Sequence, residues 1–198
     1  MLTRASYAGG QRYAMTWTGD NDSTWNHLKL SVPMIENLGL SGFAWSGANV
    51  GGFSASPSAE PLTRWIEVAA VTPLFRDHAA KGTAPREPWV DGPEQTTIRR
   101  RFIAARYRLT PCLYAHADET ARTGLPVMRP VLFEFPAMVA NLRDAPQVFI
   151  HGDRCRHPRL DADGRDDSPW RRGGGLHLRP PRARCCMSSC LTRPGQSI

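Results

Sequence analysis

The spacing of apolar residues predicts that residues 1–122 alternate between helices and short strands. The first helical pattern has apolar residues at steps of three and four, at Trp25, Leu28, Val32, Ile35 and Leu38. This is the period of a helix with one buried face. Asp22 or Ser23 is expected to cap its N-terminus, and Gly39 is expected to end it. Pro33 is expected to kink it, because proline removes a backbone hydrogen bond.

Two further helices are predicted downstream. One spans about 59–70, with its apolar face at Leu62, Trp65, Ile66 and Ala69. The next begins at the Gly-Pro-Glu of residues 92–94, since proline suits the first helical position and an acid the first turn. It should run to Gly124, bent or divided at Pro111. Its apolar stripe is predicted at Ile98, Phe102, Ala105, Leu109, Leu113, Tyr114 and Ala117.

Short apolar runs between the helices predict strands. They are the Gly-Phe-Ala-Trp-Ser of residues 42–46 and the Leu-Phe of residues 74–75. Strands that alternate with helices are typical of an α/β architecture. Residues 127–136 are rich in β-branched and aromatic side chains, which indicates that a β-rich domain begins there.

Charge is unevenly distributed along the 198 residues. The formal net charge is +7, and ten of the arginines lie between Arg154 and Arg193. The remainder is nearly balanced, and the only lysines are Lys29 and Lys81. This distribution argues against a nucleic-acid partner. No apolar run is long enough for a transmembrane helix and no signal peptide is evident, so a soluble protein without a membrane partner is expected, in an unknown compartment.

The sequence changes character at residue 154. From 154 to 198 there is no apolar periodicity, and Arg, Pro, Gly, Asp and Cys dominate, so this segment is predicted to be a disordered tail. A shift of reading frame near residue 153 would explain the change. The cysteines of the tail do not have the paired spacing of a zinc site. We therefore predict no metal, no disulfide and no cofactor.

Three motifs carry candidate chemistry. Residues 17–21 read Trp-Thr-Gly-Asp-Asn, residues 47–53 read Gly-Ala-Asn-Val-Gly-Gly-Phe, and residues 75–78 read Phe-Arg-Asp-His. Gly-Asp-Asn alone is a turn signal. With Arg4 before them, these motifs in this order and spacing resemble the second half of the catalytic barrel of glycoside hydrolase family 31, the retaining α-glucosidases.

The resemblance spans about residues 3–153 and implies a domain layout. Residues 1–123 would be the C-terminal part of a (β/α)₈ TIM barrel, which as a whole needs about 250 residues. Residues 124–153 would begin a β-sandwich, and 154–198 would follow as the tail. The chain is thus expected to be a truncated part of an enzyme.

The resemblance also implies roles for individual residues. Asp20 would be the catalytic acid/base. Substrate would be bound by Arg4, Trp17, Asn49, Phe53 and His78. Arg76 and Asp77 would support the site, Arg76 by pairing with a carboxylate. Asn49 is a departure, because the family normally has an aspartate there.

A retaining mechanism needs a second carboxylate, the nucleophile, about 5–5.5 Å from the acid/base. In the family it comes from a segment like Trp-x-Asp-Met-Asn, which these 198 residues do not contain. The chain is therefore expected to be inactive alone, although its parent would hydrolyse terminal α-linked glucose from oligosaccharides. Two alternatives remain open: a noncatalytic carbohydrate-binding remnant, and a basic interaction protein that acts through residues 154–198.

Overall fold

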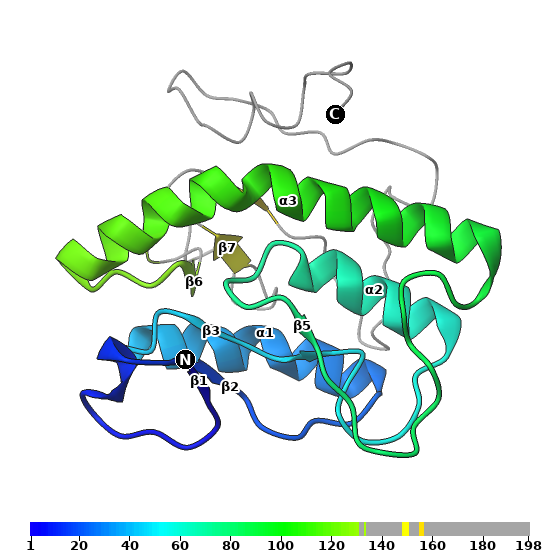
Figure 1. Cartoon of the computed structure of the whole chain (residues 1–198). Helices are drawn as coiled ribbons and strands as arrows, with labels where there is room; N and C mark the ends of the chain where they lie inside the picture. The colour runs from blue at the N-terminus through cyan, green and yellow to red at the C-terminus, as the bar shows by residue number, and fades with distance from the viewer. Residues whose placement is uncertain (131–132, 134–147, 151–154, 157–198) are drawn as a thin grey trace, which may run out of the picture.

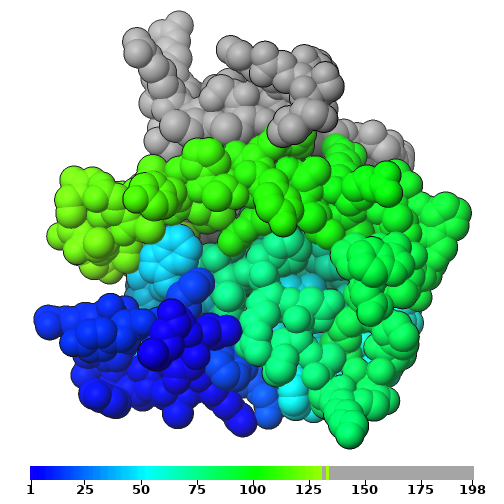
Figure 2. All heavy atoms as spheres, in the orientation of Figure 1, coloured from blue at the N-terminus to red at the C-terminus, as the bar shows by residue number. Residues whose placement is uncertain are grey.

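The computed structural model describes residues 1–130, 133, 148–150 and 155–156. Its helices are α1 (Trp25–Leu40), α2 (Ala59–Ala69) and α3 (Gly92–Thr123), with a short 3₁₀ turn at Gly10–Arg12. Helix α3 packs on α2, and α1 lies on the opposite side of the molecule beside the N-terminal strands (Figure 1). In the space-filling view α3 forms a continuous ridge, and the N-terminal residues (blue) lie at the other side of the molecule (Figure 2).

Five short parallel strands lie between these helices. β1 (Leu2–Thr3), β2 (Met15–Trp17) and β3 (Ser46–Gly47) form one sheet, and β4 (Asn49–Val50) pairs with β5 (Arg76–Asp77). The chain is therefore α/β in these residues, as predicted. The strand positions predicted at 42–46 and 74–75 are wrong by a few residues. Pairing across the ladder, and not the apolar run, decides which residues are in the strand.

The predicted limits of α1 are also wrong. Thr24 is the N-cap, and its side chain accepts a hydrogen bond from the His27 amide at 3.3 Å. Ser23 lies one residue before the cap position, and its hydroxyl donates to the Ser54 carbonyl at 2.8 Å. Gly39 lies inside the helix, where an added Cβ would come within 2.7 Å of Pro126. This glycine allows α1 to approach the following segment closely, and the helix continues through Pro33.

Helices α2 and α3 follow the predictions more closely. The apolar face predicted for α2 is buried, and α3 begins and ends as predicted, with the terminal Gly124 in the left-handed region at φ 75°. Pro111 does not divide α3, which is one helix. Tyr114 is 79% exposed, so the predicted stripe is wrong there. Leu113 is buried as predicted, and Cys112 beside it is also buried, because they lie three and four residues after Leu109 on the same face.

Two clusters of buried side chains hold the layers together. One joins α1 to α3 and β6 (Met128–Pro130) through Ile35, Ala48, Leu109, Cys112, Leu113, Val127 and Met128. The other joins α1 and β4 to α2 through Leu28, Val50, Leu62, Trp65, Ile66 and Ala69. Full burial of a large apolar side chain contributes about 1.5–3 kcal/mol, so these clusters fix the strands that carry the motifs.

Beyond α3 the described chain is antiparallel. β6 pairs with β7 (Val148–Ile150), and β7 pairs with β8 (Cys155–Arg156). β8 lies within the segment predicted to be disordered, so that expectation does not hold for its two residues. The rest of that segment and most of 131–147 lie outside the described residues. Among the helices described, none combines the length and apolarity that crossing a membrane requires.

Candidate functional site

The three sequence motifs lie in loops at the ends of parallel strands, and backbone hydrogen bonds join these loops. The amides of Phe53 and Ser54 donate to the Asn21 carbonyl at 2.6 and 3.0 Å, and the Ala80 amide donates to the Phe53 carbonyl at 3.0 Å. These bonds connect segments about 30 residues apart in sequence. The structure therefore brings the loop of Asp20 beside the loop of Phe53, and both beside the segment after β5.

Asp20 lies at the turn that follows β2. Gly19 has φ 92°, in the left-handed region that favours glycine. The Asp20 carboxylate pairs with Arg4, whose Nη1 is 3.2 Å from Oδ2, and the two side chains are 35% and 60% exposed. An exposed pair of this kind contributes at most about 1 kcal/mol. Its main effect is to hold Arg4 against the carboxylate.

Trp17 and Arg76 are stacked. The guanidinium carbon of Arg76 lies 4.9 Å from the centroid of the Trp17 ring, within the range of a cation–π contact. Trp17 Nε1 and Arg76 Nη1 are buried without a hydrogen-bond partner among the described residues. The carboxylate predicted to pair with Arg76 is not found in this part of the chain.

Asn49 is completely buried between the loops. Its side-chain Nδ2 donates to the Gly19 carbonyl at 3.2 Å, and its backbone carbonyl accepts from Asn21 Nδ2 at 3.3 Å. The acceptor Oδ1 of Asn49 is buried and has no partner among the described residues. Asn49 is opposite Arg76 in the β4–β5 register, so the two side chains lie on the same face of that pair.

Phe53 and His78 meet at the other end of the cluster. Their ring centroids are 5.2 Å apart, with the planes inclined by 34°. Both rings are half-buried. All the predicted site residues are thus linked by direct contacts or by adjacent backbone, from Arg4 through Asp20 and Phe53 to His78 and Arg76.

Arg86 is a site residue that the sequence did not identify. It is buried, its Nη1 donates to the Gly52 carbonyl, and its Nη2 donates to the Ala55 carbonyl at 3.0 Å. Arg86 therefore holds the loop that carries Phe53. An arginine in a turn-rich segment has no periodicity to mark it, and its partners are backbone atoms more than 30 residues away.

Asp77 has an altered protonation equilibrium. Burial raises the pKa of its carboxyl to about 6, although part of the residue remains exposed. The charges of Arg86 and Arg99 act in the opposite direction, and Glu87 adds to the rise.

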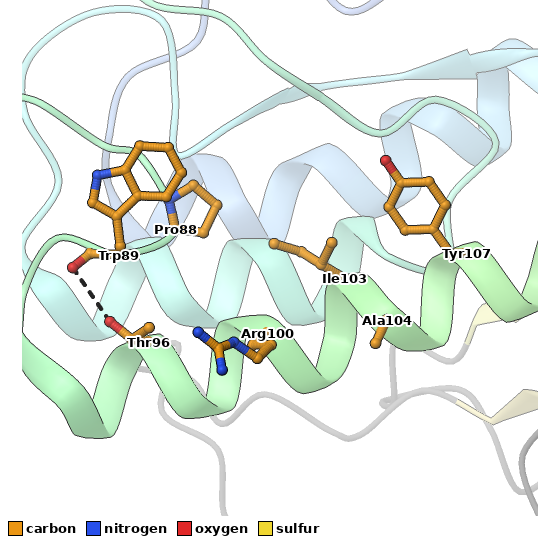
Figure 3. A pocket seen from close by; sticks show the side chains of 7 residues that line it. All are labelled: Pro88, Trp89, Thr96, Arg100, Ile103, Ala104 and Tyr107. Carbon is orange, nitrogen blue, oxygen red and sulfur yellow. Dashed lines mark hydrogen bonds between the residues drawn. The ribbon is translucent and has the colours of Figure 1, made fainter. Parts of the chain in front are cut away.

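A separate hollow lies on the surface of α3. It has a volume of about 300 Å³ and is almost entirely apolar. Trp89 and Tyr107 stand at its two ends, with Pro88 and Ile103 between them (Figure 3). The hollow contains no carboxylate and none of the predicted site residues, so it is not the candidate active site. We call those eight residues the strand-end cluster: Arg4, Trp17, Asp20, Asn49, Phe53, Arg76, Asp77 and His78. The described residues also contain no group of three potential metal ligands.

Comparison with known proteins identifies close relatives. Residues 1–116 match the model of the glycosyl hydrolases family 31 TIM-barrel domain. The chain is 51% identical over 136 residues to alpha-glucosidase 2 of Bacillus thermoamyloliquefaciens, covering 69% of this chain and 17% of that protein. It is 37% identical to neutral alpha-glucosidase AB of Dictyostelium discoideum over all 198 residues, or 19% of that protein. The chain therefore spans less than a fifth of the length of these relatives.

Solved structures give the same result. The family 31 alpha-glucosidase from Bacteroides thetaiotaomicron superposes with a TM-score of 0.72 at 44% identity, covering 77% of this chain and 26% of that one. Glucosidase II alpha subunit, in its Glc1Man2-bound form, gives 0.72 at 39% identity over 75% of this chain and 16% of that one. The Dictyostelium match includes residues 154–198, so the reading-frame shift stays a prediction that this comparison does not support.

Proposed function

This chain belongs to glycosyl hydrolase family 31, and we propose that it forms the acid/base half of a retaining α-glucosidase active site. Membership makes it an α-glucosidase-like glycosidase by family. Its named relatives are α-glucosidases, and it spans only 15–19% of their length. The activity and substrate of the whole protein are therefore part of the proposal.

One observation carries this proposal: contacts between loops gather all eight predicted site residues at the ends of parallel strands. In the proposed site Asp20 protonates the leaving oxygen and then activates water. Arg4 holds the Asp20 carboxylate at 3.2 Å. Trp17, Phe53 and His78 contact the sugar, and Arg76 and Asp77 support the site.

Two buried polar atoms at the strand ends lack a partner among the described residues. Arg76 Nη1 is a donor without a partner among the described residues, and Asn49 Oδ1 is such an acceptor, at opposite register positions. Neighbouring strands are about 4.8 Å apart. A sugar hydroxyl can accept from one group and donate to the other. Both atoms are enclosed by the chain, so we assign them to one small bridging hydroxyl.

The nucleophile belongs to a different part of the enzyme. None of the 198 residues has the context of the family's catalytic aspartate, so the chain alone is proposed to be inactive. Residues 1–123 would be the last repeats of the barrel, and 124–153, with β6 and β7, the start of a β-sandwich. Residues 154–198 would follow as a tail of mainly irregular structure.

A chimera tests the role of Asp20. Residues 1–130 replace the matching stretch of the Bacteroides family 31 α-glucosidase, and hydrolysis of aryl α-glucosides is measured with the anomer of the product. Asp20→Asn should lower kcat by about 10²–10⁴-fold with a poor leaving group, the usual size of an acid/base contribution. The loss should be much smaller with a dinitrophenyl leaving group, which needs no proton, and azide should restore turnover.

Asp22→Asn is the matched control, because Asp22 lies two residues further along the same loop. It should keep most of the activity. Equal losses for Asp20→Asn with both leaving groups, or an inverted product, would refute the proposal. Turnover by the unmodified 198-residue chain would refute its inactivity.

A noncatalytic carbohydrate-binding role is the second candidate, favoured by the missing nucleophile segment. It requires the isolated chain to bind sugar through the strand-end cluster. A rise in its melting temperature with maltose, lost in His78→Ala, would support this function. No change at millimolar sugar would exclude it.

A further inference from the structure

Arg86 bonds the backbone on both sides of Phe53. Its Nη1 donates to the carbonyl of Gly52, directly before Phe53, and its Nη2 donates to the carbonyl of Ala55 at 3.0 Å. Only 6% of Arg86 is exposed. A guanidinium is planar and rigid, so these two bonds fix the distance between the two carbonyls. The backbone that carries the Phe53 ring lies between them.

The loop that Arg86 holds has an unusual backbone. Gly52 and Ala55 both lie in the left-handed region, at φ 81° and 62°. This conformation is unfavourable for alanine because its Cβ crowds the following carbonyl, so contacts must hold it. The Ala55 carbonyl accepts from Arg86 Nη2 and, at 3.3 Å, from the Ser23 hydroxyl. Loss of the Arg86 bonds would therefore let this loop relax and move Phe53.

Arg86 also connects the two rings at this end of the strand-end cluster. It follows His78 in the same segment after β5, so its bonds join the segment that carries one ring to the loop that carries the other. The Ala80 amide donates to the Phe53 carbonyl at 3.0 Å, and the ring centroids of Phe53 and His78 are 5.2 Å apart. The relative placement of the two rings therefore depends on how Arg86 joins these segments.

We propose that Arg86 is the positioning residue of the Phe53–His78 pair, and that it acts through the two-point geometry of its guanidinium and not through its charge. This inference deepens the proposed function and rests on it for the sugar contact of the two rings. Arg86 itself does not touch the sugar. The alternative is a charge effect, because the charge of Arg86 acts to lower the pKa of the Asp77 carboxyl against the effect of burial.

Arg86→Lys in the full chain separates geometry from charge. Lysine keeps the positive charge, but its single nitrogen cannot take both positions of the guanidinium fork. The parent should show a nuclear Overhauser contact between the Phe53 and His78 rings, and the variant should lose it. The Ala80 amide, which bonds the Phe53 carbonyl, should exchange about tenfold faster in the variant.

Arg99→Lys is the matched control. Arg99 is also buried and also bonds two backbone carbonyls, but in the α2–α3 region. The control should lower global stability and leave the ring contact and the Ala80 exchange unchanged relative to that stability. Retention of the ring contact in Arg86→Lys, or unchanged Ala80 exchange, would show that the fork is not needed. The proposal is also wrong if the parent lacks the ring contact, or if Arg86→Lys is unfolded while the parent is folded.

A double-mutant cycle in the chimera measures the same link through substrate binding. Arg86→Lys should raise KM for an aryl α-glucoside about tenfold and change kcat less, because it loosens contacts made in the ground state. In a Phe53→Ala background the same change should raise KM by less than about twofold, since the ring that Arg86 positions is gone. Equal rises in both backgrounds would overturn the inference.

The two experiments also separate this inference from the proposed function. If Phe53→Ala alone leaves KM unchanged, the sugar contact assigned to Phe53 under the proposed function is wrong. The ring contact and the Ala80 exchange in the full chain then still decide whether Arg86 positions the pair, because neither measurement involves a sugar.

Discussion

Two arginines show how differently the α2–α3 region and the strand-end cluster are built. Arg99 on α3 is fully buried, and its guanidinium donates to Thr63, Asp91 and two backbone carbonyls at 2.7–3.0 Å. Arg76 on β5 lies over a Trp17 ring with its Nη1 buried and unpartnered in the described chain. The guanidinium of Arg99 is fully hydrogen-bonded within the fold, whereas that of Arg76 keeps an unsatisfied donor among the described residues.

The difference extends beyond these two side chains. Buried polar atoms without a described partner gather around the strand ends, at Thr16 Oγ1, Trp17 Nε1, Asn21 Oδ1, Ser46 Oγ, Asn49 Oδ1 and Arg76 Nη1. Native proteins leave few such atoms. In contrast, Arg106 of α3 donates to the carbonyls of Ala70, Thr72 and Pro73. Six of the nine buried polar atoms without a partner among the described residues therefore belong to residues at or beside the strand ends that carry the motifs.

The largest expected effect is that of Arg99→Ala. Removing the guanidinium leaves Asp91 and the buried carbonyls without their donor, which should lower the free energy of unfolding by about 3–5 kcal/mol. Urea denaturation measures this loss. Arg100→Ala, at the exposed neighbouring position, is the control and should stay within about 0.5 kcal/mol. A loss below about 1 kcal/mol for Arg99→Ala would mean that its bonds do not hold α2 to α3.

An intermediate effect is expected for Glu36 on α1. This residue has a buried polar atom without a described partner although it lies outside the candidate site. Burial raises the pKa of Glu36 to about 7 from its ordinary 4.5, and its Oε1 has no partner among the described residues. The folded state then binds more protons than the unfolded state between about pH 4.5 and 7. Stability should fall as pH rises through this window.

Glu36→Gln should remove most of that fall. Allowing for the partial exposure of the group, the variant should gain about 1 kcal/mol over the parent at pH 8 and little at pH 4.5. Urea midpoints at the two pH values measure the difference. Asp77→Asn is a useful comparison, because the window for Asp77 ends near pH 6. Parallel pH profiles for parent and Glu36→Gln would show that another group controls the slope.

The smallest effect is expected for Arg76→Met. Methionine keeps the contact with Trp17 and removes an unsatisfied donor, so stability should change by less than about 1 kcal/mol or rise. Thermal unfolding measures the change, and the chimera should still lose activity. A loss as large as that of Arg99→Ala would mean that Arg76 is as structural as Arg99, and the comparison would fail.

The sequence predicted best what depends on neighbours along the chain. The buried face of α2 and both ends of α3 were predicted correctly because periodicity, the proline near residue 92 and the glycine at 124 act locally. The Thr24 cap was missed because the first turn begins at Trp25, while Ser23 bonds a segment 31 residues away. Whether α3 is bent or divided at Pro111 was left open by the sequence, and it stays one helix. Leu109, Cys112 and Leu113, on both sides of the proline, pack into one cluster with residues of α1 and β6.

The family, the α/β alternation and the candidate residues follow from the order and type of the amino acids alone. Only the tertiary structure decided that Asn49 bonds the turn of Asp20, that Arg86 holds the Phe53 loop, and that Arg76 stacks on Trp17. The reason is physical. Motifs and helix faces are local patterns, whereas a hydrogen bond between distant loops depends on separations of a few ångströms that the packing of α1, α2 and α3 sets.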